Sequence, residues 1–374
     1  MQRYVIVGAG ILGASAAYLL SKKGAEVIVV DRKHQGQATD AAAGIICPWL
    51  SQRRNKAWYA LAKNGAAFYP ALIEQLRADG ETETGYARVG AVSLQHDHEK
   101  LRKMEDRALK RKEEAPEMGE IKILTPEAAQ ALFPALKEEY GAVHVSGAAR
   151  VDGRALRDAL LRGAQKNGAL LVKDDASLLF SRNRVTGVKA GGESIEANKV
   201  IVCAGAWANE LFKPLGIHMN VTYQKAQIVH LQFRDTDTSH WPVVMPPSDQ
   251  YVLALEDGRI IIGATHENDP DGYDHRITAG GLHEVFNKGL ETAPGLSEAS
   301  FTEARAGFRP FTPGFLPVIG KLPGWEGILF ANGLGASGLT MGPFIGEQLA
   351  KLALEMELDI DLSLYPVEDA IQLS

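Results

Sequence analysis

The chain has 374 residues, of which 45% are hydrophobic and 23% are charged, and its formal net charge is −6. This composition is typical of a globular protein with room for two domains. The acidic balance speaks against a nucleic-acid-binding protein, which would need a basic face, and no apolar run reaches the length of a membrane span. We therefore expect no nucleic-acid partner and no integral membrane segment.

The two cysteines, Cys47 and Cys203, lie in apolar segments of the sequence. Such positions indicate buried, reduced thiols rather than a disulfide framework. The first predicted strand begins by residue 4, so we expect no signal peptide. Both features predict a cytoplasmic protein.

Residues 4–20 have the order buried strand, glycine turn, helix. The strand is apolar on both faces, as in the centre of a parallel sheet. Gly8 permits the tight turn, Gly10 lets a pyrophosphate approach the backbone, and Gly13 lets the helix lie close to the strand. The helix, which ends near Gly24, offers its N-terminal N–H groups to a phosphate.

A second strand, residues 25–30, ends at Asp31, where dinucleotide-binding units place an acid that holds a ribose hydroxyl. A lone glycine pattern is weak, but strand, glycines, helix, strand and acid all occur here in order. We predict FAD or NAD rather than NADP, although the adjacent Arg32 weakens the distinction.

Residues 37–48 are dominated by small side chains, and two interpretations stay open. Small residues let the backbone lie against a flat cofactor ring, or they form a tightly packed helix start with Thr39 or Asp40 as the N-cap. The following Arg53 and Arg54 are interpreted as surface charges, with a lesser chance of reaching a pocket mouth. An amphipathic helix is predicted from residue 55 to residue 77.

Residues 81–146 carry no obvious chemistry. A strand is predicted over 86–94 and a solvated, highly charged helix over 99–120. Thr125 begins a further helix as its cap. Next come a helix capped by Asp152 and strands over 169–172, 185–189 and 199–203, the last of which runs into a small-residue loop beginning at Ala204. Such a loop at a helix start is another signal of backbone close to a ligand.

Residues 219–233, 250–255 and 259–264 alternate like antiparallel strands, with a hairpin turn at Asp257 and Gly258. The sheet carries three candidates for a pocket wall, namely Tyr223, Tyr251 and His266.

Residues 327–354 predict strand, glycine loop and helix, with Pro343 in the first helical turn. A further glycine loop that opens a helix favours FAD over NAD. One helix N-terminus would serve the pyrophosphate and another the flavin ring, which gains negative charge on reduction.

These motifs together resemble the FAD-dependent D-amino-acid oxidase superfamily, and the pattern is most similar to bacterial glycine oxidase and D-amino-acid dehydrogenase. The resemblance covers nearly the whole chain and rests on Gly8–Gly13 with Asp31, Thr39–Gly44, Val202–Trp207, Ala306–Pro310 and Gly333–Thr340. It implies an α/β fold in which a Rossmann-like FAD-binding domain (residues 1–80, 147–222 and 310–374) accompanies a discontinuous antiparallel-sheet substrate domain (81–146 and 223–309).

The resemblance also implies roles for individual residues. Arg309 would grip the substrate carboxylate, with Tyr251 helping to hold it. Structural alternatives are a salt bridge for Arg309 and core packing for Tyr251. The implied cofactor-binding residues are Gly8, Ala9, Gly10, Ile11, Leu12, Gly13, Asp31, Arg32, Thr39, Ala42, Ala43, Gly44, Ile45, Ile46, Ser177, Ala204, Gly205, Trp207, Gly335, Ala336, Ser337, Gly338, Leu339 and Thr340.

The implied function is oxidation of glycine or small D- or N-methyl amino acids by hydride transfer to the flavin, giving an imine, then a 2-oxoacid, with hydrogen peroxide. The alternative is a D-amino-acid or imino-acid dehydrogenase that passes electrons to a quinone or another carrier. A tRNA-modifying enzyme and a non-enzymatic dinucleotide-binding module are disfavoured. A homo-oligomer is compatible with the sequence, and no metal site is expected.

Two departures from sarcosine oxidase matter. That enzyme attaches its flavin through a cysteine near the region of Arg309, but no cysteine follows residue 203 here, so we expect non-covalent FAD. Its oxygen-activating lysine corresponds to Ile261, which leaves the electron acceptor open.

Overall fold

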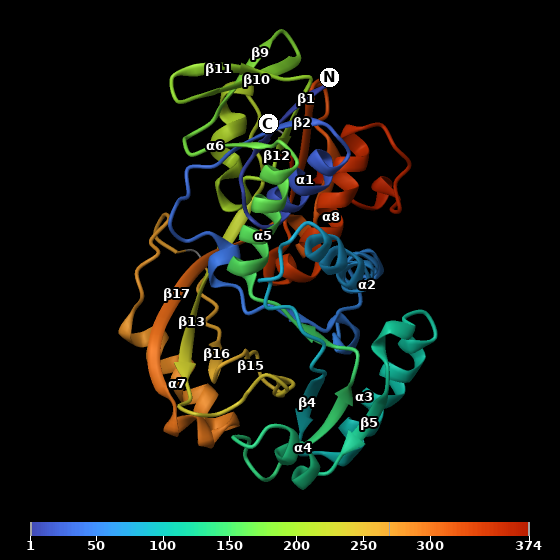
Figure 1. The fold of residues 1–374 in the computed structure, drawn as a ribbon, viewed down its shortest axis with the longest axis vertical. Coiled ribbons are helices and arrows are strands. Elements are labelled where there is room, and N and C mark those ends of the chain that lie inside the picture. The colour runs from blue at the N-terminus through green and yellow to red at the C-terminus, as the bar shows by residue number, and fades with distance from the viewer. Residues whose placement is uncertain (1, 269, 373–374) are drawn as a thin grey trace.

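The computed structural model describes residues 2–268 and 270–372. Figure 1 shows two parts along the longest axis of the molecule, with the chain termini in the upper part. The upper part holds a mainly parallel sheet with helices, and the lower part holds a large, mainly antiparallel sheet. This arrangement confirms the predicted α/β class with two kinds of sheet.

The upper sheet has six strands, and five of them are parallel. The sixth, β18, is an antiparallel edge strand. In spatial order the strands are β18 (Val318–Lys321), β19 (Ile328–Asn332), β12 (Lys199–Val202), β1 (Arg3–Val7), β2 (Glu26–Val30) and β8 (Leu170–Val172). Alternate residues of β1 enter hydrophobic clusters on opposite faces, which explains its continuous apolar sequence.

Four helices pack on one face of this sheet, and the three-stranded sheet and α6 cover the other. The helices are α1 (Ile11–Lys22), α2 (Lys56–Ala78), α5 (Gly153–Lys166) and α8 (Gly338–Ala353). The opposite face carries β9 (Ser177–Ser181), β10 (Arg184–Ala190), β11 (Glu193–Glu196) and the short helix α6 (Ala208–Phe212). Small residues bring α1 and α8 close together, since a Cβ on Gly346 would lie 2.6 Å from the Cβ of Ser15.

The lower sheet is built from two segments that are far apart in the sequence. Its eight strands, in spatial order, are β17 (Ser300–Phe311), β13 (Thr222–Gln232), β16 (Arg259–Gly263), β15 (Tyr251–Ala254), β14 (Val243–Met245), β4 (Ala91–Gln95), β6 (Gly141–Val145) and β5 (Ile121–Leu124). All neighbours are antiparallel except β14 and β4, which are parallel where the two segments join. The predicted antiparallel sheet is therefore correct apart from this one seam.

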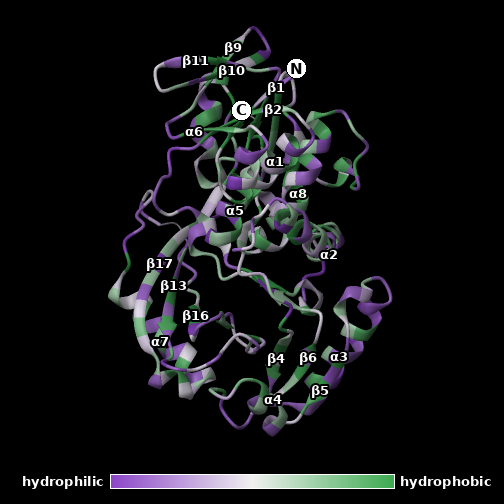
Figure 2. Ribbon diagram, in the orientation of Figure 1, coloured by the Kyte–Doolittle hydropathy of each residue, from purple (hydrophilic) through white to green (hydrophobic). Residues whose placement is uncertain are grey.

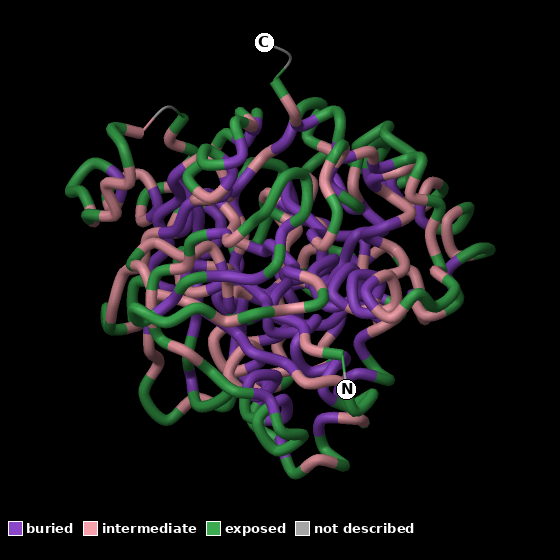
Figure 3. Tube along the Cα trace, turned by 90° about the horizontal axis from the view of Figure 1, so that it is seen from above, coloured by how far each residue is buried: buried purple, intermediate pink, exposed green. Residues whose placement is uncertain are grey.

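The remaining regular elements surround or connect the two sheets. Figure 1 shows α7 beside β13 and α3 beside β5. The bounds are α3 (His98–Lys112), α4 (Pro126–Leu132), α7 (Ala279–Thr292), and the paired short strands β3 (Ile45–Ile46) and β7 (Ala149–Arg150). Figure 2 draws interior strands such as β4 in the green of hydrophobic residues, and Figure 3 shows the buried segments gathered in the middle of the molecule.

Two predicted elements are shorter in the structure. The charged helix expected to reach Glu120 ends at Lys112, because Pro116 cannot continue a helix and disfavours helical geometry just before it. The strand expected over 86–94 begins only at Ala91, after Gly90 takes a φ of 77°.

The prediction for Pro343 is wrong. Helix α8 begins at Gly338, so Pro343 lies in its second turn rather than its first. A proline there removes the N–H that would reach the carbonyl four residues earlier. That carbonyl, on Leu339, instead accepts a hydrogen bond from the Tyr69 hydroxyl at 2.5 Å.

The predicted domain limits fall close to strand ends. Strand β13 begins at Thr222, one residue before the predicted start of a substrate-domain segment, and β17 continues to Phe311, two residues past its predicted end. The limits themselves stay a prediction.

Candidate active site

The parallel strands β1, β12 and β19 end at a cavity of about 440 Å³ that reaches the lower sheet. Ligands of open α/β sheets bind at the carboxyl ends of the strands, and this cavity lies there. Most of the predicted site residues line it: Gly8, Gly10, Ile11, Leu12, Asp31, Arg32, Thr39, Ala42, Ala43, Gly44, Ile45, Ser177, Ala204, Gly205, Trp207, Tyr251, Arg309, Gly335, Ala336, Gly338, Leu339 and Thr340. Segments separated by hundreds of residues therefore meet around one elongated space.

The glycines of the first turn divide into two roles. A Cβ on Gly13 would lie 1.9 Å from the Gly8 carbonyl oxygen, so Gly13 is required for packing. Gly10 has a φ of −65°, and its nearest obstacle to a Cβ is the Thr39 hydroxyl at 3.4 Å. The fold alone therefore leaves room for a side chain at Gly10, whereas a ligand against the backbone would not.

Asp31 is held by the same turn. Its carboxylate accepts hydrogen bonds from the backbone N–H of Ala9 at 2.6 Å and from the side chain of Gln37 at 3.0 Å. The hydrogen bond from Ala9 to Asp31 connects the glycine turn to the end of β2. An acid anchored at this place stands beside the N-terminus of α1, where a nucleotide ribose and its phosphates would lie.

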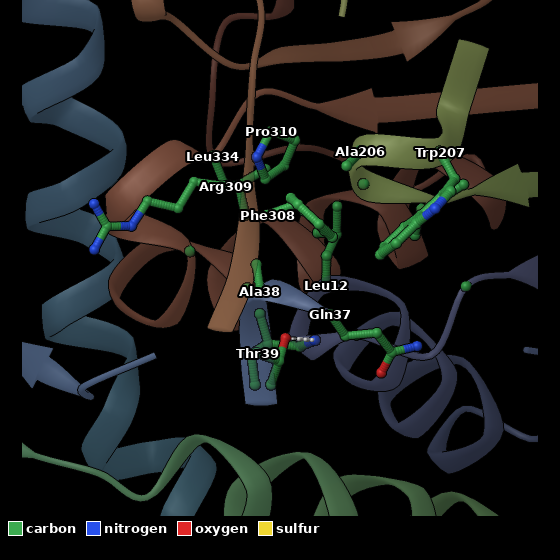
Figure 4. Close-up of a pocket in the computed structure, with 18 of the residues that line it drawn as sticks. Leu12, Gln37, Ala38, Thr39, Ala206, Trp207, Phe308, Arg309, Pro310 and Leu334 are labelled. Atoms are coloured by element: carbon green, nitrogen blue, oxygen red, sulfur yellow. Dashed lines mark hydrogen bonds between the residues drawn. The ribbon is translucent and has the colours of Figure 1, made fainter. Parts of the chain in front are cut away.

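The alternative of a helix start with Thr39 or Asp40 as its cap is wrong. Residues 38–41 form one 3₁₀ turn whose N-cap is Gln37, and no side chain caps it. Thr39 instead accepts a hydrogen bond from the Ile11 N–H at 3.0 Å, drawn in Figure 4. Asp40 bonds to Arg157. Residues 38–44 thus provide a hydrogen-bond acceptor, the Thr39 hydroxyl, for the first N–H group of α1, and their small side chains line the cavity.

Four predicted residues do not line this cavity. The backbone N–H of Ala9 is bonded to Asp31, and Gly13, within α1, packs against the Gly8 carbonyl. Ile46 is buried and pairs with Ala149. Ser337 faces a second, smaller cavity.

The far wall of the cavity carries Arg309 and Tyr251. The Arg309 guanidinium makes a long hydrogen bond, 3.4 Å to the side-chain oxygen of Gln224, and it also interacts with the Tyr251 hydroxyl. No carboxylate of the described residues forms an ion pair with it. Figure 4 shows this guanidinium pointing away from Trp207 and Phe308. The salt-bridge alternative for Arg309 has no partner in the described part of the chain.

Burial raises the pKa of Tyr251, and the Arg309 guanidinium opposes that rise. The phenol is therefore neutral near pH 7 and able to donate a hydrogen bond. It lies opposite Gly263 on the neighbouring strand, where a Cβ would come within 2.7 Å of the Tyr251 hydroxyl. The glycine thus leaves space for that hydroxyl.

His266 lines the cavity near these two residues. Burial first, and then Arg309, lower the pKa of His266, while Asp249, 3.3 Å away, opposes the shift. Asp249 is itself paired with Lys288 at 3.2 Å. The third predicted wall residue, Tyr223, lies elsewhere: it stacks on Tyr273 with ring centroids 4.8 Å apart and is absent from the described lining.

Several residues of the site were missed in the sequence. Asn332, 2% exposed, donates to the Gly205 carbonyl at 2.8 Å and so ties two of the glycine loops together. His34 packs against Trp207 with ring centroids 4.9 Å apart and the ring planes tilted by 49°. A polar residue at the end of an apolar strand was a usable signal for Asn332, but the His34 contact joins positions 173 apart and has no local signal.

The geometry fits a dinucleotide with a second ring system. Gly10 leaves its backbone open, α8 begins without a side-chain cap, and the buried Trp207 indole N–H has no acceptor among the described residues. These features lie along one cavity, as a long, polar-and-aromatic cofactor requires.

Comparison with known proteins settles the family. The family model DAO, FAD dependent oxidoreductase, matches residues 3–352. The chain belongs to this family, and its cofactor is FAD. An uncharacterized oxidoreductase, YurR of Bacillus subtilis (strain 168), is 60% identical over 99% of this chain and 100% of its own length.

Two relatives carry more specific names. Glycine oxidase of Pseudomonas aeruginosa PAO1 is 30% identical over 97% of this chain and 98% of its own length. The crystal structure of iminodiacetate oxidase (IdaA) from Chelativorans sp. BNC1 superposes with a TM-score of 0.94 at 45% identity, covering 97% of this chain and 98% of that one. The similarity to both therefore covers the upper parallel sheet and the lower sheet alike.

The structure also has no helix, within residues 2–268 and 270–372, that is long and apolar enough to cross a membrane. Both cysteines are buried and free, and burial raises the pKa of each thiol to about 12. The expectation of buried thiols without a disulfide is therefore confirmed.

Proposed function

We propose that this FAD-dependent oxidoreductase oxidises the amine of a small amino acid, glycine or a small D- or N-methyl amino acid. The observation that carries the proposal is Arg309, an arginine in the cavity wall without a carboxylate partner among the described residues. Similarity to glycine oxidase and iminodiacetate oxidase supports a substrate in which the amine is next to a carboxylate-bearing carbon.

In this proposal Arg309 binds the substrate carboxylate through two parallel N–H bonds, which fix the orientation of the substrate as well as its charge. Tyr251 adds a hydrogen bond from its neutral hydroxyl. Such placement of the α-carbon supplies most of the catalysis, because a reactant already held in position loses little further entropy.

When bound, FAD would supply a two-electron acceptor for a hydride from the α-carbon of the neutral amine. The residues around the substrate then need no strong base, and His266, whose pKa is lowered, adds no positive charge that would repel the developing iminium. Water hydrolyses the product imine to a 2-oxoacid and releases the amine or ammonia. In an oxidase the electrons pass to oxygen and give hydrogen peroxide.

The electron acceptor has two candidates. Ile261, at the position where sarcosine oxidase has its oxygen-activating lysine, is 3% exposed in β16. A dehydrogenase that passes electrons to a quinone or another carrier is therefore the second candidate beside an oxidase.

A substrate panel with two readouts tests the proposal. Purified, FAD-loaded protein is mixed with glycine, sarcosine, D-alanine, D-proline and iminodiacetate, and peroxide is measured in air beside reduction of an artificial dye. We expect at least one amino acid to be oxidised and peroxide to appear with it. Dye reduction without peroxide would favour the dehydrogenase, and turnover of none of these compounds would contradict amino-acid oxidation.

Two further properties belong to this proposal. The flavin is held without a covalent bond, because both cysteines are buried and none lies after residue 203, near Arg309. The protein acts in the cytoplasm on a small-molecule substrate, an assignment that rests on its free, buried cysteines.

A further inference from the structure

A second cavity of about 300 Å³ adjoins the candidate active site. The two cavities have three lining residues in common, Leu334, Gly335 and Ala336, all in the glycine loop before α8. The shared wall is built from backbone and small side chains over most of its length.

Arg53 is the charged residue of this second cavity. Its guanidinium lies over the Trp58 ring, 4.7 Å from the centroid, and makes one long hydrogen bond, 3.4 Å to the Phe315 carbonyl. An arginine stacked in this way keeps most of its five N–H donors free and loses little further entropy on binding an anion.

No carboxylate in the described part of the chain forms an ion pair with Arg53. Burial lowers the pKa of Arg53, and no acid among the described residues offsets that effect. The neighbour Arg54 is also exposed, but none of the described residues bonds to its side chain or stacks on it. Arg53 is exposed, but unlike Arg54 it is stacked on an aromatic ring, and the described chain leaves its charge without a counter-ion.

The path of β17 relates this cavity to the substrate residues. Side chains two positions apart in a strand lie on the same face, roughly 7 Å from each other. Arg309 lines the main cavity, and Phe311, two positions later, lines the second. The two arginines therefore line adjoining cavities that are both bordered by β17 and by the glycine loop before α8.

We propose that Arg53 binds a second carboxylate of the substrate, so that the substrate is an amino dicarboxylate held at one end by Arg309 and at the other by Arg53. This inference rests on the proposed function, because it assumes that Arg309 holds the carboxylate beside the reacting carbon. It names Arg53 as a specificity-determining residue and dicarboxylic amines as the substrate class.

A binding titration tests the inference without turnover. FAD-loaded protein is titrated with thiodiacetate, which has two carboxylates and no amine, and with methylthioacetate, which has one, while the flavin absorbance spectrum is recorded. Wild type should bind thiodiacetate about tenfold or more tightly than methylthioacetate, as expected for one charged hydrogen-bonded contact. Arg53→Gln should remove most of that preference, Arg53→Lys should restore part of it, and the matched control Arg54→Gln should retain it.

Equal affinities for the two ligands in wild type would overturn the inference, as would an equal loss for both in Arg53→Gln. Steady-state kinetics provide a second test beside the binding titration. The ratio of kcat/KM for iminodiacetate to kcat/KM for sarcosine should fall about tenfold or more in Arg53→Gln and stay unchanged in Arg54→Gln. A ratio that Arg53→Gln leaves intact would contradict the role of Arg53.

The binding titration and the kinetics together separate this inference from the proposed function. A preference for thiodiacetate that depends on Arg53, in a protein that oxidises no amine, would keep the second anion site and refute amino-acid oxidation. Oxidation of amino acids without any such preference would keep the proposed function and refute the role of Arg53.

Discussion

Arg309 and Gly10 are the two residues whose chemistry is least explained by the fold itself. Within the described chain, the Arg309 guanidinium has no carboxylate partner and contacts only neutral groups such as Gln224 and Tyr251, and Gly10 has space for a side chain that the sequence does not supply. An arginine with so little to hold it and an unneeded glycine both point to a missing partner. The substrate carboxylate would be the partner of Arg309, and the cofactor pyrophosphate that of Gly10.

Replacing Arg309 by alanine should lower kcat/KM for every active amino acid by about thirty-fold to several-thousand-fold. Loss of a charged partner of a desolvated carboxylate costs on the order of 2–5 kcal/mol, and ~1.4 kcal/mol corresponds to each decade. Arg309→Lys should recover little activity, because the compact ammonium group of lysine cannot form the two parallel N–H bonds of a guanidinium. Tyr251→Phe should cost much less, about 1 kcal/mol for one neutral hydrogen bond.

The measurement is steady-state kinetics beside a flavin spectrum. Flavin content should stay normal in all three variants, which separates a substrate role from a folding role. Near-wild-type kcat/KM in Arg309→Ala would show that the substrate carboxylate is not bound there.

Replacing Gly10 by valine should abolish FAD binding while the protein still folds. Its branched side chain would occupy the place where the pyrophosphate meets the backbone. Gly13→Val is the informative comparison, because a Cβ there would lie 1.9 Å from the Gly8 carbonyl oxygen and should destabilise the fold itself. Flavin absorbance and thermal unfolding distinguish the two variants, and full flavin content in Gly10→Val would argue against this phosphate site.

At the scale of elements, the helix α8 joins the fold to the site. Its first residues line the cavity, and its second turn contains Pro343. The Tyr69 hydroxyl, from α2, satisfies the Leu339 carbonyl that the proline leaves without its usual donor. Two helices far apart in sequence thus keep the start of α8 in a regular conformation beside the main cavity.

Tyr69→Phe should therefore lower the free energy of unfolding by about 1–3 kcal/mol, the range for leaving a buried acceptor unsatisfied. Urea unfolding measures the change. Tyr140→Phe is a matched control, since no described residue bonds to that hydroxyl, and it should change stability much less. Equal effects of the two variants would refute the special role of the Tyr69 contact.

Helices, strands and turns were predictable where residues close in sequence encode them. The glycine spacing before α1, the cap at Asp152 and the turn at Asp257 and Gly258 all encode structure within a few residues. The end of α3 was also encoded locally, in Pro116, and was overlooked because charge patterning alone was followed. The parallel seam between β14 and β4 has no local signal, because it depends on how two distant segments meet.

The residues of the site also divide into those with a local sequence signal and those placed by long-range contacts. Loops such as Gly8–Gly13 and Gly333–Thr340 were identified from their own sequences, and most of their residues line the cavity. The capping of Ile11 by Thr39, the bridge from Asn332 to Gly205, and the position of Arg53 each require tertiary structure. These contacts determine the shape of the cavity, so its specificity could not be predicted from motifs.

At the scale of the whole molecule, stability should depend on His230, which is 6% exposed in the lower sheet. Burial first, and then the Arg305 charge, lower its pKa from 6.5 to about 4. The native state thus favours the neutral His230 ring more than the unfolded state does. The stability that His230 contributes is therefore fully present above pH 6.5 and is lost as pH falls from 6.5 toward 4. At ~1.4 kcal/mol per pH unit, up to roughly 3 kcal/mol is involved.

We therefore expect the free energy of unfolding of His230→Gln to depend less on pH than that of wild type between pH 6.5 and pH 4. Denaturant unfolding at several pH values measures this difference. The exposed control His98→Gln should follow wild type. Parallel pH profiles for wild type and His230→Gln would show that His230 does not contribute.

Anaerobic reduction of the bound flavin tests carboxylate-guided amine oxidation most directly. FAD-loaded wild type and Arg309→Ala are mixed without oxygen with iminodiacetate and sarcosine, and with dimethylamine, which has no carboxylate. We predict that at least one of the two amino acids bleaches the wild-type flavin rapidly, that the same compound bleaches Arg309→Ala at least about thirty-fold more slowly at limiting concentration, and that dimethylamine bleaches neither. Equally fast bleaching of wild type by dimethylamine, or equal rates in wild type and Arg309→Ala, would contradict a carboxylate-guided amine oxidation at this site.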